Sequence, residues 1–138
     1  MKIVVIDGQG GKMGRSIIEK LLQYNMRPGE ITAIGTNSIA TENMLKASPD
    51  FAATGENAAV VACRDADVIC GPMGILVADA LLGEITPRMA VAVGQSKAKK
   101  VLVPVDRCGV FVAGVADKQM ADLISLAADE VLSFVDNK

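Results

Sequence analysis

Residues 2–14, with the sequence KIVVIDGQGGKMG, decide the fold class of this chain. Residues 3–6 are all apolar and β-branched, a pattern typical of a strand that is buried on both faces. Four glycines then fall within residues 7–14, and apolar side chains recur at helical spacing from Met13 to Leu22. A strand, a glycine-rich turn and an amphipathic helix in this order predict the opening unit of a Rossmann-like α/β fold.

The remainder of the chain continues this alternation of strands and helices. Apolar runs and capping residues predict strands at 31–35, 68–70, 101–105 and 110–115, and helices towards 46, through 62, at 75–82, from 87 onward and after 117. Only residues 106–109 separate the last two strands, so these could form an antiparallel hairpin. We therefore predict a single-domain, Rossmann-like, doubly wound α/β fold over residues 1–138. Its five-stranded sheet is mostly parallel, with that hairpin as an open alternative at one edge.

The composition suits one aliphatic core. Of the 138 residues, 51% are hydrophobic but only 3% are aromatic, which favours α/β architecture over a β-sandwich. The net charge of -2 and the scattered basic residues argue against a nucleic-acid partner. Three widely spaced cysteines and an N-terminus without a signal-peptide pattern predict a reduced, cytoplasmic protein. The longest apolar stretch, 73–82, is interrupted by Asp79, so we expect no membrane span.

Glycines and small polar residues follow the predicted strands at 8–14, 35–38, 71–74 and 106–108. Because the carboxyl ends of parallel strands share one edge of a sheet, these loops are expected to converge there, where open α/β sheets bind ligands. We predict that thirteen residues contact a ligand at this edge: Gly8, Gln9, Gly10, Gly11, Lys12, Met13, Gly14, Thr36, Asn37, Ser38, Gly71, Pro72 and Gly74.

The glycine-rich stretch is suited to hold a phosphate. Glycines permit positive φ and let backbone N–H groups approach an anion, and the following helix adds the positive end of its dipole. A tight strand-to-helix turn without a ligand is the alternative, although such a turn needs fewer glycines. The stretch is not a P-loop, because Ile6 stands where the first glycine of that motif belongs and Met13 replaces its Ser or Thr.

The end of the second predicted strand bears on the choice of nucleotide. NAD-binding proteins usually place an acidic residue there, whereas this chain has Thr36, Asn37 and Ser38. These neutral groups favour NADP, or a ligand that lacks the second ribose. We therefore expect NAD(P) or an adenine nucleotide, that is, a small phosphorylated ligand.

Groups able to do chemistry are few. The chain has no histidine, and we predict no metal site and assign no catalytic residue. Asp7 could point away from a phosphate, bind a ribose, hold a metal or accept N–H bonds from the glycine turn. The sequence places five further reactive groups at the same edge: Lys12, Cys70, Asp106, Arg107 and Cys108. Both cysteines also suit a core-filling role. Glu84 precedes a predicted helix start and could serve either a site or a turn.

Two resemblances add to this interpretation. GQGGKMGR, residues 8–15, resembles the nucleotide loop of dihydrodipicolinate reductases, with Gly8, Gly11, Lys12, Met13 and Gly14 matching its pattern. This resemblance implies a Rossmann fold that uses NADH or NADPH. Across the chain, IDGQGG, GTNSIAT, ATGENA, CGPMGI, GEITPRMA and VLVPVDRC resemble a family of short bacterial proteins described as a domain of unknown function. It implies a small stand-alone Rossmann-like protein.

Three functions stay open at this point. The first is a nucleotide-binding module that acts as a sensor, a regulatory subunit or a component of a larger assembly. The second is a small reductase or transferase, in which Lys12 or Arg107 clamps phosphate and Asp7 or Asp106 moves a proton or holds Mg²⁺. The third is a ligand-free assembly protein. The apolar helix expected at 75–82 further predicts a homo-oligomer.

Overall fold

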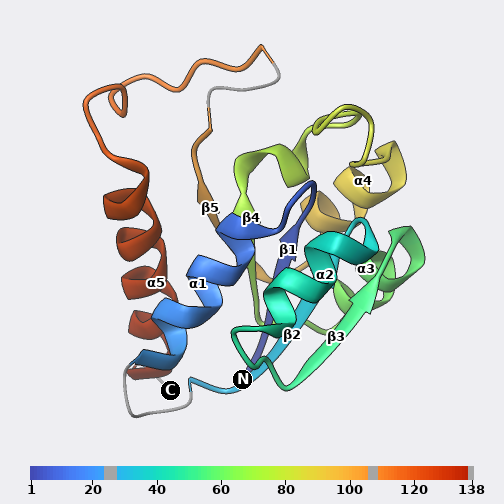
Figure 1. The fold of residues 1–138 in the computed structure, drawn as a ribbon, viewed down its shortest axis with the longest axis horizontal. Coiled ribbons are helices and arrows are strands. Elements are labelled where there is room, and N and C mark those ends of the chain that lie inside the picture. Colours follow the sequence, from blue (N-terminus) through green and yellow to red (C-terminus); the bar gives the residue numbers. More distant parts are fainter. Residues whose placement is uncertain (24–27, 106–108, 137–138) are drawn as a thin grey trace.

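The computed structural model describes residues 1–23, 28–105 and 109–136. Within these ranges, five parallel strands form one sheet in the order β3-β2-β1-β4-β5 (Figure 1). The strands are β1 (Lys2–Asp7), β2 (Glu30–Gly35), β3 (Phe51–Thr54), β4 (Val68–Pro72) and β5 (Lys99–Val103). This order confirms the doubly wound, Rossmann-like class, because the chain runs outward from β1 in one direction and then in the other.

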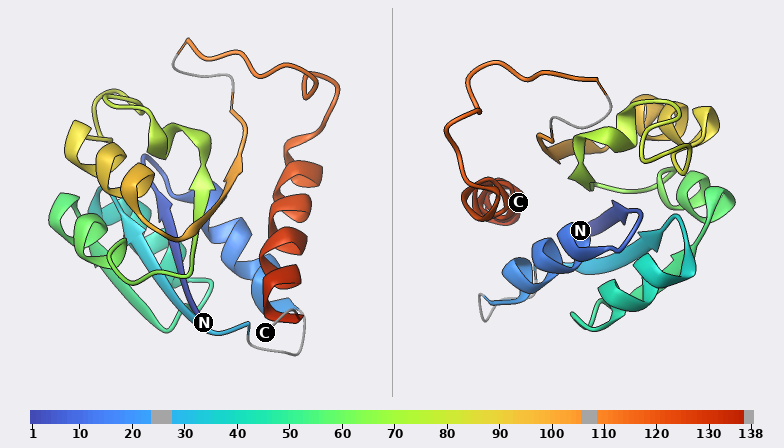
Figure 2. Two further views of the ribbon diagram at one scale, coloured as in Figure 1. Left: turned by 180° about the vertical axis from the view of Figure 1, so that it is seen from behind. Right: turned by 45° about the horizontal axis from the view of Figure 1, so that its top comes forward.

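Helices cover both faces of the sheet (Figure 2). The elements are α1 (Lys12–Gln23), α2 (Ser38–Leu45), α3 (Glu56–Ala62), the 3₁₀ helix η1 (Met73–Leu76), α4 (Pro87–Gln95) and α5 (Met120–Asp136). In β1, Ile3 and Val5 pack against residues from α1, α2 and α5, whereas Val4 and Ile6 pack against α3, η1 and α4. β1 is therefore buried on both faces, as its run of β-branched residues predicts.

The predicted strand at 110–115 was wrong. The structure has no strand at 109–119, so the proposed hairpin is not formed. The sheet still has five strands, because β3, which the sequence did not predict, lies at one edge. The sequence of residues 47–53, which Pro49 interrupts, predicts a loop rather than a strand. Phe51–Thr54 nevertheless pairs in parallel with β2, from Thr32 opposite Phe51 to Gly35 opposite Thr54. Three of these four residues are exposed, which explains the weak sequence signal.

The predicted apolar helix at 75–82 was also wrong. Only η1 forms there, and the chain then turns irregularly through residues 77–85, hereafter the 77–85 segment. Asp79, Leu81 and Leu82 have φ values of 66°, 57° and 57°, a left-handed conformation that no α-helix contains. The next helix begins as predicted, with the Thr86 hydroxyl accepting from Met89 N (3.2 Å) and proline at the first helical position.

The last helix starts at Met120 rather than at the predicted cap Asp117 and packs along α1 (Figure 2). Its apolar stripe, including Ile124, Ala128 and Val131, closes the core on that side of the sheet. Among the described residues, we find no helix with the length and apolar character needed to cross a membrane.

Candidate functional site

A cavity of about 670 Å³ lies at the carboxyl ends of β1 and β4. The strand order reverses between these two strands, and open α/β sheets bind their ligands at such a switch point. One wall of this switch-point cavity is polar and consists of residues 7–13 with Ser16. The opposite wall is mostly apolar and consists of Pro72, Gly74, Leu81, Val105, Met120 and Ile124. The cavity therefore pairs backbone amides with a surface suited to a ring.

Asp7 holds the turn between β1 and α1. One of its carboxylate oxygens accepts from Gly8 N and the other from Gly14 N, both at 2.8 Å. The residue is 6% exposed, and burial raises the pKa of its carboxyl although the backbone hydrogen bonds act in the opposite direction. Of the interpretations left open by the sequence, the structure therefore shows the one in which Asp7 accepts N–H bonds from the glycine turn.

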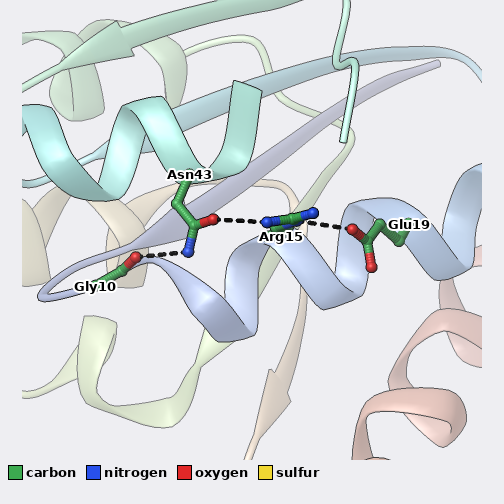
Figure 3. Close-up of polar contacts among 4 residues, drawn as sticks. All are labelled: Gly10, Arg15, Glu19 and Asn43. Carbon is green, nitrogen blue, oxygen red and sulfur yellow. Dashed lines mark hydrogen bonds and ion pairs between the residues drawn. The ribbon is translucent and has the colours of Figure 1, made fainter. Parts of the chain in front are cut away.

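The glycine loop, residues 8–11, is fixed from its outer side by α2. A Cβ on Gly11, whose φ is 72°, would lie 2.5 Å from the carbonyl oxygen of Ala40, so only glycine permits this close approach. The carbonyl of Gly10 accepts from Asn43 Nδ2 (2.8 Å), and Asn43 Oδ1 accepts from Arg15 Nη1 (3.0 Å) (Figure 3). Gly10 lines the switch-point cavity, and nothing lies within 4 Å of a Cβ built on it.

Two amides where the glycine loop joins α1 have no hydrogen-bond partner among the described residues. Gly11 N donates to Gly8 O (2.9 Å), and Gln9 N donates to Glu84 Oε1 (3.0 Å). In the part of the chain that the structure describes, no hydrogen-bond partner is found for the amides of Gly10 and Lys12. Both residues line the switch-point cavity at the start of α1, where the helix dipole favours an anion.

The end of β2 is occupied by Glu84 from the 77–85 segment. Its Oε1 atom accepts from Thr36 Oγ1 (2.5 Å) and Asn37 Nδ2 (2.7 Å) as well as from Gln9 N. Burial alone would raise the pKa of Glu84, but these three hydrogen bonds together lower it, so the side chain is a carboxylate at neutral pH. The end of β2 thus has an acidic group beside Thr36, but a residue 48 positions later in the chain provides it.

The structure brings eight of the thirteen predicted residues together around the cavity: Gly8, Gln9, Gly10, Gly11, Lys12, Met13, Pro72 and Gly74. The other five do not line it. Gly14 packs between Asp7 and Met44, Gly71 packs against the Ile6 carbonyl, and Thr36, Asn37 and Ser38 lie at the β2 end. Three predicted reactive residues fall outside the described residues: Asp106, Arg107 and Cys108.

The sequence did not predict the other four residues of the apolar wall, which are Leu81, Val105, Met120 and Ile124. Met120 and Ile124 belong to the apolar stripe of α5, which gave no signal beyond that of a core-facing helix. Leu81 belongs to the segment that was expected to be helical. The thiols of Cys63 and Cys70 are buried, which raises the pKa of Cys63 to about 11 and that of Cys70 to about 12. Both are therefore neutral, as core fillers are.

Residues 2–136 match the sequence profile of a family described as "Domain of unknown function (DUF3842)". The chain belongs to this family. The match confirms the resemblance to a domain of unknown function. That its members are short bacterial proteins stays a prediction, as does the likeness of residues 8–15 to dihydrodipicolinate reductases. No curated protein matches the sequence significantly.

The DUF3842 chain is also similar in fold to a solved structure. The structure is that of a dodecameric FMN-dependent UbiX-like decarboxylase from Escherichia coli O157:H7, with a TM-score of 0.51 and 20% sequence identity. The similarity covers 99% of this chain and 76% of that one. At this level of identity it confirms the Rossmann-like fold and carries no residue assignment.

Proposed function

We propose that this chain is a nucleotide-binding module that holds the phosphate of its ligand at the start of α1. One observation carries the proposal: the amides of Gly10 and Lys12 have no partner among the described residues, and both residues line a cavity of about 670 Å³ at the switch point. That volume lies within the usual range of about 300–1,000 Å³ for ligand sites.

The chemistry of the two walls supports a nucleotide. The amides, the α1 dipole and the Lys12 ammonium group all favour a phosphate at the polar wall. Val105, Met120 and Ile124 offer a planar ring an apolar surface on the other side. The sequence favours NAD(P) or an adenine nucleotide, and the apolar wall also suits flavin mononucleotide, the cofactor named for the similar E. coli decarboxylase.

Binding rather than turnover is the role that these residues support. The carboxylate at the cavity, Asp7, has both oxygens engaged by backbone amides and is thereby fixed as part of the turn. Cys70 is a buried neutral thiol. A sensor, a regulatory subunit or one component of a larger assembly fits this equipment, and a small reductase or transferase is the alternative.

Thermal unfolding with and without nucleotides tests the proposal. A ligand at 100 times its Kd should stabilise the protein by about 2.7 kcal/mol. We expect Lys12→Ala to weaken nucleotide binding by about three- to tenfold, because one charge-assisted phosphate contact is lost. Lys97→Ala is the matched control, since Lys97 is an exposed lysine that does not line the cavity. If NADH, NADPH, AMP and flavin mononucleotide all leave the midpoint unchanged at millimolar concentration, the proposal is wrong.

We further propose that the chain self-associates through the 77–85 segment. Leu82 is 97% exposed and Leu76, just before the segment, is 39% exposed, which is unusual for large apolar side chains. The similar E. coli protein is a dodecamer. Light scattering after size exclusion should give a multiple of the 14.4 kDa monomer mass. Leu82→Ser should shift that mass towards the monomer, and a wild-type monomer would contradict the proposal.

A further inference from the structure

Glu84 lies between the glycine loop and the end of β2, bonded to Gln9, Thr36 and Asn37. Given the proposed nucleotide binding, on which this step rests, we infer that the 77–85 segment closes the β2 side of the switch-point cavity and that Glu84 restricts the ligand to a mononucleotide. Residues 10–13 then hold its one phosphate, and its ring lies towards β5 and α5.

The first argument concerns the groups that a second nucleoside would use. A doubly wound sheet binds a dinucleotide across its switch point, with the adenosine half over the end of β2. In this chain the side chains at that end, Thr36 and Asn37, both donate to Glu84 Oε1. They line no part of the cavity, whereas residues beyond β4 and β5 do. The switch-point cavity therefore extends from the glycine loop towards β4 and β5 and not over the end of β2.

The second argument concerns space above Gly8. A Cβ built on Gly8 would lie 2.7 Å from Leu81 Cδ1, 2.7 Å from Thr36 Oγ1 and 3.2 Å from Glu84 Oε1. These side chains already rest on the backbone of the loop. A pyrophosphate could not cross Gly8 towards β2 unless the 77–85 segment moved away.

The third argument is electrostatic. The polar wall offers one phosphate two free amides and the Lys12 ammonium group, whereas a second phosphate directed towards β2 would face the carboxylate of Glu84. Like charges repel each other, so the Glu84 side chain both fills the space beside Gly8 and repels a second phosphate there.

The 77–85 segment is closed by a hydrogen bond between two of its own residues, and the residue that follows it is bonded to α3. Asp79 N donates to Ile85 O (2.7 Å), and the hydroxyl of Thr86 donates to Glu56 Oε1 (2.6 Å). Leu81, which rests on Gly8, is held in a left-handed conformation that a non-glycine residue rarely adopts. Strained positions of this kind gather at ligand clamps. Figure 1 shows the segment, between η1 and α4, at the carboxyl end of the strands.

Matched ligand pairs test the inference. Flavin adenine dinucleotide and NAD⁺ each consist of a mononucleotide extended by AMP, so isothermal titration can compare flavin mononucleotide and nicotinamide mononucleotide with their dinucleotides on the full chain. We expect at least one mononucleotide to bind about tenfold or more tightly than its own dinucleotide. Equal or tighter binding of both dinucleotides would overturn the inference and leave the proposed nucleotide binding intact. Failure of all four ligands would overturn both.

Variants of Glu84 identify the cause of the discrimination. Glu84→Ala removes both bulk and charge and should bring the dinucleotide to within about threefold of the mononucleotide, whose own affinity should change less than about twofold. Glu84→Gln keeps the size but removes the charge and should restore part of the discrimination. Glu42→Ala makes the same change of charge at an exposed helix position and should leave the ratio of dinucleotide Kd to mononucleotide Kd unchanged. Suppose that Glu84→Ala is folded by circular dichroism and has the wild-type ratio of dinucleotide Kd to mononucleotide Kd. This result would show that Glu84 does not set the ligand class.

Discussion

Replacing Gly11 by alanine should destabilise the protein strongly. Alanine in a left-handed conformation costs about 1–2 kcal/mol, and the new methyl group would lie 2.5 Å from Ala40 O and 2.7 Å from Ala40 Cα. Both contacts are with backbone, which cannot turn aside as a flexible side chain can, so overpacking adds about 1–3 kcal/mol. Reduced freedom of the unfolded chain offsets about 0.4–1 kcal/mol of this. We expect a net loss of roughly 1–5 kcal/mol.

Urea unfolding followed by circular dichroism measures this loss. The free energy of unfolding of a domain is about 5–15 kcal/mol, so the midpoint should shift visibly while the slope stays the same. Gly10→Ala is the matched control. Gly10 is the neighbouring residue, it has no positive φ, and nothing lies within 4 Å of a Cβ added to it. That variant should stay within about 0.5 kcal/mol of wild type. Equal stability of the two variants would refute the claim that Gly11 lets the loop approach α2.

Three further outcomes follow from contacts described above. Because folding raises the pKa of Asp7, the free energy of unfolding of the wild type should fall as pH rises from about 4 through the raised pKa. Asp7→Asn should lack this pH-dependent component, and urea midpoints measured across pH test both expectations. Asn43→Ala should cost about 1 kcal/mol in thermal unfolding, because the Gly10 carbonyl loses its donor, whereas an unchanged midpoint would contradict that role. Iodoacetamide should label Cys63 and Cys70 only after unfolding, as mass spectrometry of the native and denatured chain would reveal.

Elements with a strong local pattern were predictable from the sequence. β1 and α1 carry their own signals, a run of β-branched residues and an amphipathic repeat, and Thr86 with Pro87 marks the start of α4. β3 could not be predicted, because Phe51–Thr54 is short and mostly exposed, and its strand character comes from pairing with β2. Residues 110–115 show the converse, because this valine-rich sequence finds no partner strand among the described residues.

The same distinction applies to the candidate site. The polar wall was predictable because its glycines are adjacent in the sequence. The β2 end was not, because Glu84 reaches Thr36 and Asn37 through a segment with φ values that sequence patterns do not reveal. An apolar run such as 75–82 fits a helix by composition, and only its tertiary contacts decide against one.

Because α5 is the last helix and lines the apolar wall, the cavity is complete only when the whole chain has folded. Met120 and Ile124 reach the cavity only when the last helix lies along the first. A nascent or truncated chain that lacks this helix would leave only Pro72, Gly74, Leu81 and Val105 opposite the glycine loop. Occupancy should accordingly slow amide hydrogen exchange throughout α5, far beyond the few residues that a ligand touches.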